Sequence, residues 1–176
     1  MYLLNGPHLK TAVHYSFYLS VLRLRNLVKD GYGVKPRQKM ITSGKYLAWC
    51  QWDRESHTST VAISPHGVLT HNRSTDHTSL LYQIANVAAH EVAHGLMNVR
   101  YMGDAWRRPF RPHGVEWQRI MKNEMGVAGK SNRFASLFLP MVLYNEPYWS
   151  EFVDVYYGWV DGQSWNTEQM QRLITI

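Results

Sequence analysis

The run His90-Glu91-Val92-Ala93-His94 constrains this chain more than any other feature. On an α-helix, residues four apart share one face, so His90 and His94 can point at one ion while Glu91 lies about 100° to the side. Neutral imidazoles bind Zn²⁺ strongly, and the ion lowers the pKa of a coordinated water toward about 7. We therefore expect a zinc site with Glu91 as the general base that takes the proton of that water.

The surroundings of this run are typical of a helix. From Leu80 to Val99 there is no proline and one glycine, and Asp76, Thr78 and Ser79 offer capping oxygens just before it. On a helical wheel the apolar residues form one stripe, which consists of Leu81, Ile84, Ala85, Ala88, Val92, Leu96 and Val99. His90 and His94 lie nearly opposite the stripe, beside Gln83, Val87 and Met97, so something else must cover that face. A surface histidine pair is the alternative, because so short a motif also arises by chance.

A catalytic zinc site also needs a third protein ligand. Position 100 is Arg100, which excludes the metzincin spacing with a histidine six residues after the second one. The downstream candidates are Asp104, His113 and Glu116. We favour His113, which precedes a second helical pattern with an apolar face of Trp117, Ile120 and Met121 that ends at Gly126. Glu116 can instead be the ligand, or can support His113 by hydrogen bonding.

The pair of motifs, His90-Glu91-x-x-His94 and His113-Gly114-x-x-Trp117, resembles the SprT-like metalloprotease domain, the family that includes Spartan. The resemblance covers residues 87–117. It implies a zincin fold, zinc on the three histidines, Glu91 as catalytic base, and hydrolysis of proteins bound or crosslinked to DNA, a role in DNA repair. Many SprT-like proteins also carry a Cys-rich zinc ribbon. This chain has a single cysteine, Cys50, and cannot build one.

The remaining patterns predict an α+β fold, in which a small antiparallel sheet packs on the motif helix and further helices surround it. We expect a helix over about 9–29, a hairpin of strands 46–53 and 59–64, a helix carrying Phe152, Val155, Tyr156 and Trp159, and a short last helix capped by Asn166. Residues 35–39 are expected to be a short basic linker. Residues 1–176 are interpreted as one domain: a basic helical region at 1–39, a catalytic core at 40–126 and an acidic, aromatic packing region at 127–176.

Positive charge flanks the motif helix on both sides. The net charge is +6, and residues 1–39 carry seven Lys or Arg against one acid, while residues 100–133 carry eight against three. Such blocks bind phosphate backbones by counterion release, although a solvated basic surface is the alternative.

Rings and guanidiniums interleave between the two ligand motifs. Trp106, Arg107, Arg108 and Arg111 can stack bases and hold phosphates, which favours single-stranded DNA as a partner. Tyr101 is a candidate to stabilise an oxyanion. The alternative is a plain loop whose aromatic rings cap the core.

No stretch reaches the length of a membrane span, there is no signal-peptide pattern, and the lone cysteine needs no oxidising compartment. We expect a cytoplasmic, intracellular monomer, in bacteria one associated with the nucleoid, that acts as a zinc metalloendopeptidase on a protein substrate. Three alternatives remain open: a non-catalytic nucleic-acid-binding protein stabilised by zinc, a protein that inhibits a partner, and a protease that acts on free proteins.

Overall fold

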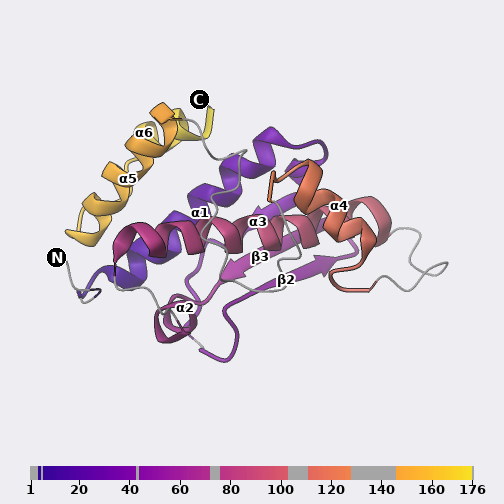
Figure 1. Cartoon of the computed structure of the whole chain (residues 1–176), viewed down its shortest axis with the longest axis horizontal. Coiled ribbons are helices and arrows are strands. Elements are labelled where there is room, and N and C mark those ends of the chain that lie inside the picture. Colours follow the sequence, from indigo (N-terminus) through magenta and orange to yellow (C-terminus); the bar gives the residue numbers. More distant parts are fainter. Residues whose placement is uncertain are drawn as a thin grey trace.

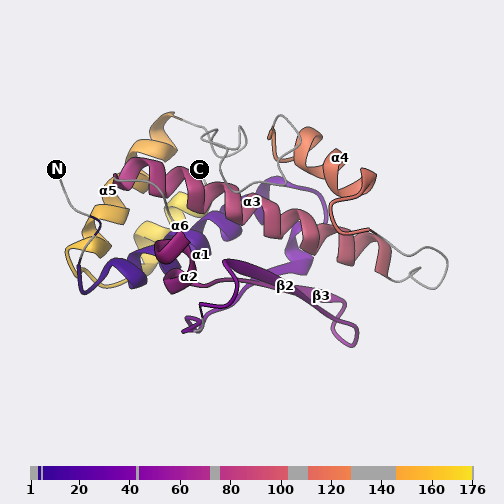
Figure 2. The same ribbon diagram turned by 60° about the horizontal axis from the view of Figure 1, so that its bottom comes forward.

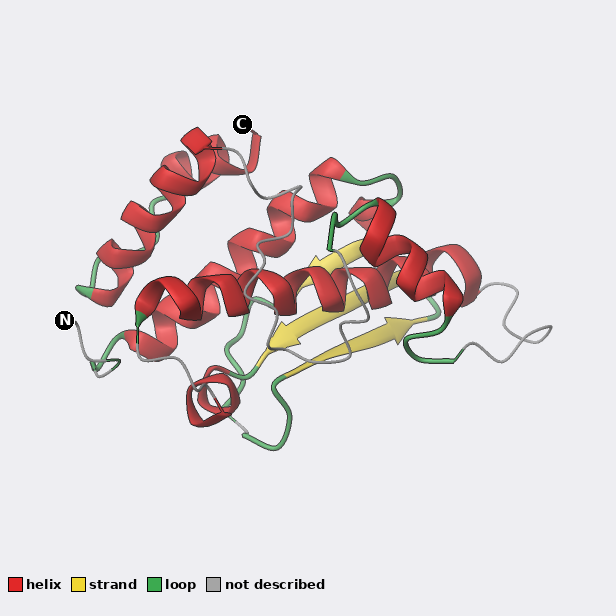
Figure 3. Ribbon diagram, in the orientation of Figure 1, coloured by secondary structure: helices red, strands yellow, loops and turns green. Residues whose placement is uncertain are grey.

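A computed structural model describes residues 4, 6–42, 44–71, 76–102, 111–127 and 146–175 of the chain. Within them the fold is mixed α+β, as predicted, with six α-helices and a three-stranded sheet (Figures 1 and 3). The elements in chain order are α1 (Leu9–Leu27), η1 (Gly31–Gly33), β1 (Val34–Pro36), β2 (Ala48–Asp53), β3 (Thr58–Ile63), α2 (Pro65–His71), α3 (His77–Tyr101), α4 (Val115–Asn123), α5 (Glu146–Val160) and α6 (Thr167–Thr175).

The sheet is mixed, so the prediction of a purely antiparallel sheet was wrong. The expected hairpin is present, with β2 antiparallel to β3 and Cys50 opposite Val61. The strand β1 lies parallel to β3 on its other side, with Val34 opposite Ser59. The expected linker at 35–39 therefore begins as an edge strand. Three residues are too few to show a period of two, and Pro36 fits there because an edge strand tolerates a missing N–H.

Helix α3 lies at the centre of the molecule, where it packs against α1, the sheet and α4, while α1 also contacts β1 and β3 (Figures 1 and 2). It begins where the capping residues predicted, because the Asp76 carboxylate accepts a hydrogen bond of 2.8 Å from the Ser79 backbone N–H. The predicted apolar stripe is buried except at Val99, which is partly buried. Residues outside the stripe are mostly buried as well, among them Val87, Met97 and His90, so the second face of the helix is covered too, as expected.

Gly95 sets how closely α3 approaches the sheet. A Cβ at this position would lie 2.8 Å from both γ-carbons of Val34, in β1. Only glycine leaves that space, although glycine costs about 1 kcal/mol of helix propensity relative to alanine. The residue directly after the second histidine of the motif therefore fixes the distance between the motif helix and the sheet.

Helix α1 differs from its predicted role as the carrier of a basic flank. Arg23 is buried at 5% exposure, its guanidinium donates to the Ile174 carbonyl at 3.3 Å, and it lies 5.0 Å from the ring centre of Tyr148. Arginine side chains are seldom fully buried unless they are paired, so the basic composition of residues 1–39 does not indicate this burial. Contacts from α5 and α6, more than a hundred residues away along the chain, bury it.

The predicted C-terminal helices are both present, as α5 and α6. Asn166 caps α6 as predicted, by accepting a hydrogen bond of 3.0 Å from the Gln169 backbone N–H. Helix α5 packs against the first half of α3, where the rings of Trp149 and Tyr82 stack at 5.2 Å. In the part of the chain that the structure describes, no helix combines the length and apolar character needed to cross a membrane.

Candidate metal centre

His90 and His94 lie one turn apart on α3, and His113 approaches them from the segment just before α4. His113 has a positive φ of 61°, in the left-handed region that residues other than glycine seldom occupy. Its conformation is held on both sides, because the Gly114 N–H bonds the Arg111 carbonyl at 2.9 Å and the Gln118 side chain donates to the His113 carbonyl at 3.1 Å. Backbone strain of this kind is typical of functional sites.

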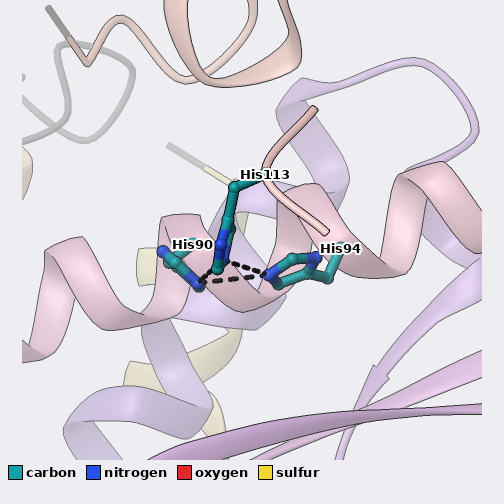
Figure 4. A group of neighbouring side chains, drawn as sticks. All are labelled: His90, His94 and His113. Carbon is teal, nitrogen blue, oxygen red and sulfur yellow. Dashed lines mark hydrogen bonds between the residues drawn. The ribbon is translucent and has the colours of Figure 1, made fainter. Parts of the chain in front are cut away.

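The three Nε2 atoms form a nearly equilateral triangle (Figure 4). The separations are 3.2 Å between His90 and His94, 3.0 Å between His94 and His113, and 3.0 Å between His113 and His90. Tetrahedral zinc with Zn–N bonds of 2.0–2.1 Å separates its nitrogen ligands by about 3.3 Å. The triangle therefore matches a zinc-sized ion to within a few tenths of an ångström. Among the described residues, these histidines form a group of side chains able to hold a metal.

Hydrogen bonds between the rings do not explain this geometry. An Nε2 atom of a neutral imidazole either carries a proton or offers a lone pair, never both in the ring plane. Among three such atoms, at most two of the three pairs can join a donor to an acceptor. The remaining pair always sets two donors or two acceptors against each other. A cation that accepts the lone pairs of all three Nε2 atoms satisfies the three atoms at once. The triangle itself therefore points to a metal ion.

Burial keeps two of these rings in the form that binds metal. His90 is buried, and the loss of hydration, with the neighbouring histidines, lowers its pKa to about 3. His94 is half-buried, and desolvation together with His113 lowers its pKa to about 4. Metals bind the neutral imidazole. Both rings are therefore ready to bind a cation at neutral pH without first losing a proton.

Trp117 holds the three rings together. Its indole lies 4.8 Å from the ring of His90, 5.7 Å from that of His94 and 4.7 Å from that of His113, measured between centroids. It is 2% exposed, and its Nε1–H points to the His90 carbonyl at 3.5 Å. From the sequence, Trp117 was predicted to belong to the apolar face of α4, and it also closes the motif His113-Gly114-x-x-Trp117. The indole also packs against all three imidazoles and limits their rotation.

Glu91 lies on the side of α3 that faces the sheet. It is 4% exposed, and desolvation raises its pKa to about 8. Burial, with Glu91 as a further cause, raises the pKa of the Cys50 thiol on β2 to about 12. The Asn98 amide donates to the Cys50 sulfur at 3.4 Å. The carboxyl group thus lies in a poorly hydrated environment, in which a proton is held at neutral pH unless a nearby positive charge favours the ionised form.

Arg100, which excluded the metzincin spacing, has a structural role. Its guanidinium bonds both carboxylate oxygens of Glu124 at 2.6 and 2.9 Å, Asp30 at 3.1 Å and the Lys29 carbonyl at 2.6 Å. It thereby ties the end of α3 to α4 and to the turn after α1. These contacts hold α4, and with it His113, against α3.

The other predicted site residues lie apart from the triangle or outside the described residues. Glu116 is half-buried and does not belong to the group formed by the three histidines. Tyr101 is partly buried against the core, and Arg111 is exposed. Asp104, Trp106, Arg107 and Arg108 fall in 103–110, which lies outside the described residues. The structure therefore brings His113 to the triangle, while the expected roles of the other residues stay predictions.

Fold and site together define a mixed α+β protein with a three-histidine candidate metal centre. No protein-family model, curated protein or solved structure matches this chain in the comparisons.

Proposed function

We propose that this chain is a zinc-dependent endopeptidase of the SprT-like type that cleaves proteins bound or crosslinked to DNA. The observation that carries the proposal is the triangle of three Nε2 atoms, 3.0–3.2 Å apart, on a helix that also bears Glu91. Three protein ligands leave one position of a tetrahedral ion for water and substrate, as in catalytic zinc sites. The identity of the metal as zinc belongs to the proposal, and it is supported by Nε2 separations close to those of tetrahedral zinc.

In this proposal each residue has one task. His90, His94 and His113 hold the ion, which when bound supplies a water that ionises near neutral pH and an electrophile for the scissile carbonyl. Glu91 accepts the proton of the attacking water and passes it to the leaving amine. The positive charge of the ion lowers the pKa of Glu91 from its raised value, so that the carboxylate is available as a base. Trp117 and Arg100 keep the ligands in position.

The DNA part of the proposal depends on charge. The chain carries a net charge of +6, concentrated on both sides of α3 in the sequence. Exposed Arg111 lies two residues before His113, so a phosphate backbone bound there would lie beside the metal site. Cleavage that occurs only when DNA brings enzyme and substrate together would also restrain a protease of this kind.

The test is cleavage of a DNA-binding protein on gels, with and without single-stranded DNA. Wild type is compared with Glu91→Gln, and Glu55→Gln, an exposed change in the turn between β2 and β3, is the matched control. We expect cleavage by wild type and by the control only with DNA. The Glu91→Gln protein is expected to bind zinc normally and to lose at least about a hundredfold in rate, the usual contribution of a general base. Full activity of Glu91→Gln contradicts the assignment of the base.

A non-catalytic, zinc-stabilised nucleic-acid-binding protein is a second candidate. The burial of His90 and Glu91, at 9% and 4% exposure, favours it, because a structural metal site is closed to solvent. In that case wild type binds zinc and DNA but cleaves nothing, and X-ray absorption shows four protein ligands. This result would replace the protease proposal.

A further inference from the structure

A pocket of about 210 Å³ opens on the side of α1 that faces the C-terminal helices. Its walls are His14, Tyr15 and Tyr18 from α1, Gln38 from the segment after β1, and Trp165 from the connection between α5 and α6. None of these residues belongs to the metal centre. Among the described residues that line it there is no Lys, Arg or aliphatic side chain, so three large aromatic rings dominate this part of its surface.

The rings stand at steep angles to one another. Tyr18 is perpendicular to Trp165, at 89° and 5.6 Å between centroids, and Tyr15 meets Trp165 at 64° and 5.3 Å. Trp165 is itself fixed, because it stacks on Trp159 at 5.7 Å with an interplanar angle of 3°. Walls in different planes can surround a small rounded group, whereas a flat ring is bound between parallel walls. The indole of Trp165 forms the rigid corner of this pocket.

The polar groups of the wall carry no formal charge. The His14 Nε2 atom lies 2.9 Å from the Gln38 carbonyl, which can only accept, so Nε2 carries the proton. Desolvation lowers the pKa of His14, and the ring is neutral at neutral pH. No protein cation therefore competes for the faces of Tyr15, Tyr18 and Trp165 from within the wall.

The charges around the pocket are mixed. Residues 146–175, which include Trp165, contain five acidic residues and one arginine, whereas Gln38 stands between Arg37 and Lys39 in the basic region 1–39. Helix α5 ends at Val160, directly after Trp159, and the C-terminal end of a helix is the negative end of its dipole. The preference of the pocket for a cation therefore rests on its aromatic rings and not on the net charge around it.

We propose that this pocket binds a small organic cation of the quaternary or methylated ammonium class. Trp and Tyr are the aromatic rings that attract a cation most strongly, and recognition of quaternary ammonium groups by rings in several planes is a general use of this attraction. Such a cation has a low cost of desolvation compared with a metal ion or a primary ammonium group, and it needs no carboxylate partner.

The test compares choline with its uncharged isostere 3,3-dimethylbutan-1-ol on the full chain. Binding is followed by the NMR signal of the Trp165 indole N–H, which a Trp165→Phe spectrum assigns. We expect saturable binding of choline, at least about fivefold tighter than that of the isostere, from the size of cation–π attraction at partly exposed sites. Equal affinity for both compounds, or no saturable shift with choline, overturns the proposal.

Variants of Tyr18 test whether its aromatic ring, and not merely the shape of the pocket wall, binds the cation. Tyr18→Phe retains the ring and is expected to bind choline within about twofold of wild type, whereas Tyr18→Leu is expected to bind it about fivefold more weakly. Tyr32→Leu is the matched control, because Tyr32 is 70% exposed and does not line the pocket. Thermal unfolding of each variant confirms that it folds. Undiminished choline binding by folded Tyr18→Leu contradicts the proposal.

Discussion

Helix α3 carries buried histidines at two places, which differ in the atoms that their ring nitrogens contact. At its first turn, His77 is 4% exposed and its Nδ1 atom lies 2.5 Å from the hydroxyl of Tyr156 on α5. Thirteen residues later, the Nε2 atoms of His90 and His94 lie close to each other and to His113. A histidine that meets an oxygen links two helices. Histidines whose Nε2 atoms converge on one another, in a triangle that protons cannot satisfy, prepare a site for a cation.

The same contrast separates the triangle from other histidines of the chain. His14 bonds the carbonyl of Gln38, and His71 lies 2.8 Å from the carbonyl of Gly67. His14 is buried without belonging to the triangle, as is His77, so burial alone does not identify ligands. The ligands are identified by the convergence of their ring nitrogens on one point. The predictions that follow compare the triangle with the His77 pair, beginning with the largest expected effect.

Removal of one corner of the triangle should abolish tight metal binding. We expect His113→Ala to weaken zinc affinity by about two to three powers of ten, since each ligand of a zinc site contributes several kcal/mol. His77→Gln should leave zinc affinity unchanged, because His77 bonds Tyr156 and not the metal. Competition with a chromophoric chelator measures both. Equal affinity of His113→Ala and wild type would move the third ligand to Asp104 or Glu116.

Acid should destabilise the metal-free protein through histidines of both kinds. Desolvation lowers the pKa of His14 and His77, while His90 titrates at about 3 and His94 at about 4. At these histidines the unfolded chain binds more protons than the folded chain below pH 6.5, so their contribution to the free energy of unfolding falls as the pH falls below that value. Glu91 acts in the opposite direction, because burial raises its pKa to about 8 and the folded chain holds that proton.

From pH 7.5 to 5 we expect a loss of about 2 kcal/mol or more in urea unfolding of the metal-free Glu91→Gln protein, in which the opposing titration of Glu91 is removed. A variant with His77→Gln should lose less over the same range. Stability that is independent of pH across this range would show that these rings remain hydrated in the folded state.

Gly95→Ala should weaken the half of α3 that carries the triangle. A methyl group at this position meets Val34 at 2.8 Å, and the cost of overpacking, reduced by the better helix propensity of alanine, is about 1–2 kcal/mol. Gly6→Ala is the control, because nothing lies within 4 Å of a Cβ there. Chemical denaturation measures both changes. A stabilised Gly95→Ala protein would mean that α3 and β1 can separate without cost.

Trp117→Leu should have the smallest effect on the site. Loss of the indole leaves three imidazoles free to rotate, and supporting residues of metal sites typically change affinity by 10–100-fold, so we expect about tenfold weaker zinc binding. The zinc stoichiometry should stay at one ion per chain. If both affinity and stability of the folded protein are unchanged, Trp117 does not position the ligands.

Much of this arrangement was predictable from the sequence, because it is local or periodic. The cap at Asp76, the apolar stripe of α3, the hairpin of β2 and β3 and the cap of α6 each arise from spacing or from a single side chain. His113 was predictable as a ligand because it shares a pattern with Trp117 and precedes a helix.

The features that were missed depend on distant parts of the chain. Strand β1 exists only because β3 offers it an edge, and Arg23 is buried by contacts with Tyr148 and Ile174. His77 lies before the run of residues 80–99 whose pattern predicted a helix, but it begins α3 and meets Tyr156, which is 79 residues away. Helix α2, over Pro65–His71, has too few residues to show a helical period. None of these contacts leaves a local signal.

Anomalous diffraction from crystals grown with zinc tests the central claim most directly. The predicted result is one peak at the zinc edge, about 2.0–2.1 Å from the Nε2 atoms of His90, His94 and His113, with a further position open to solvent. The absence of a peak at the triangle, or a zinc ion held by other residues, would contradict the account.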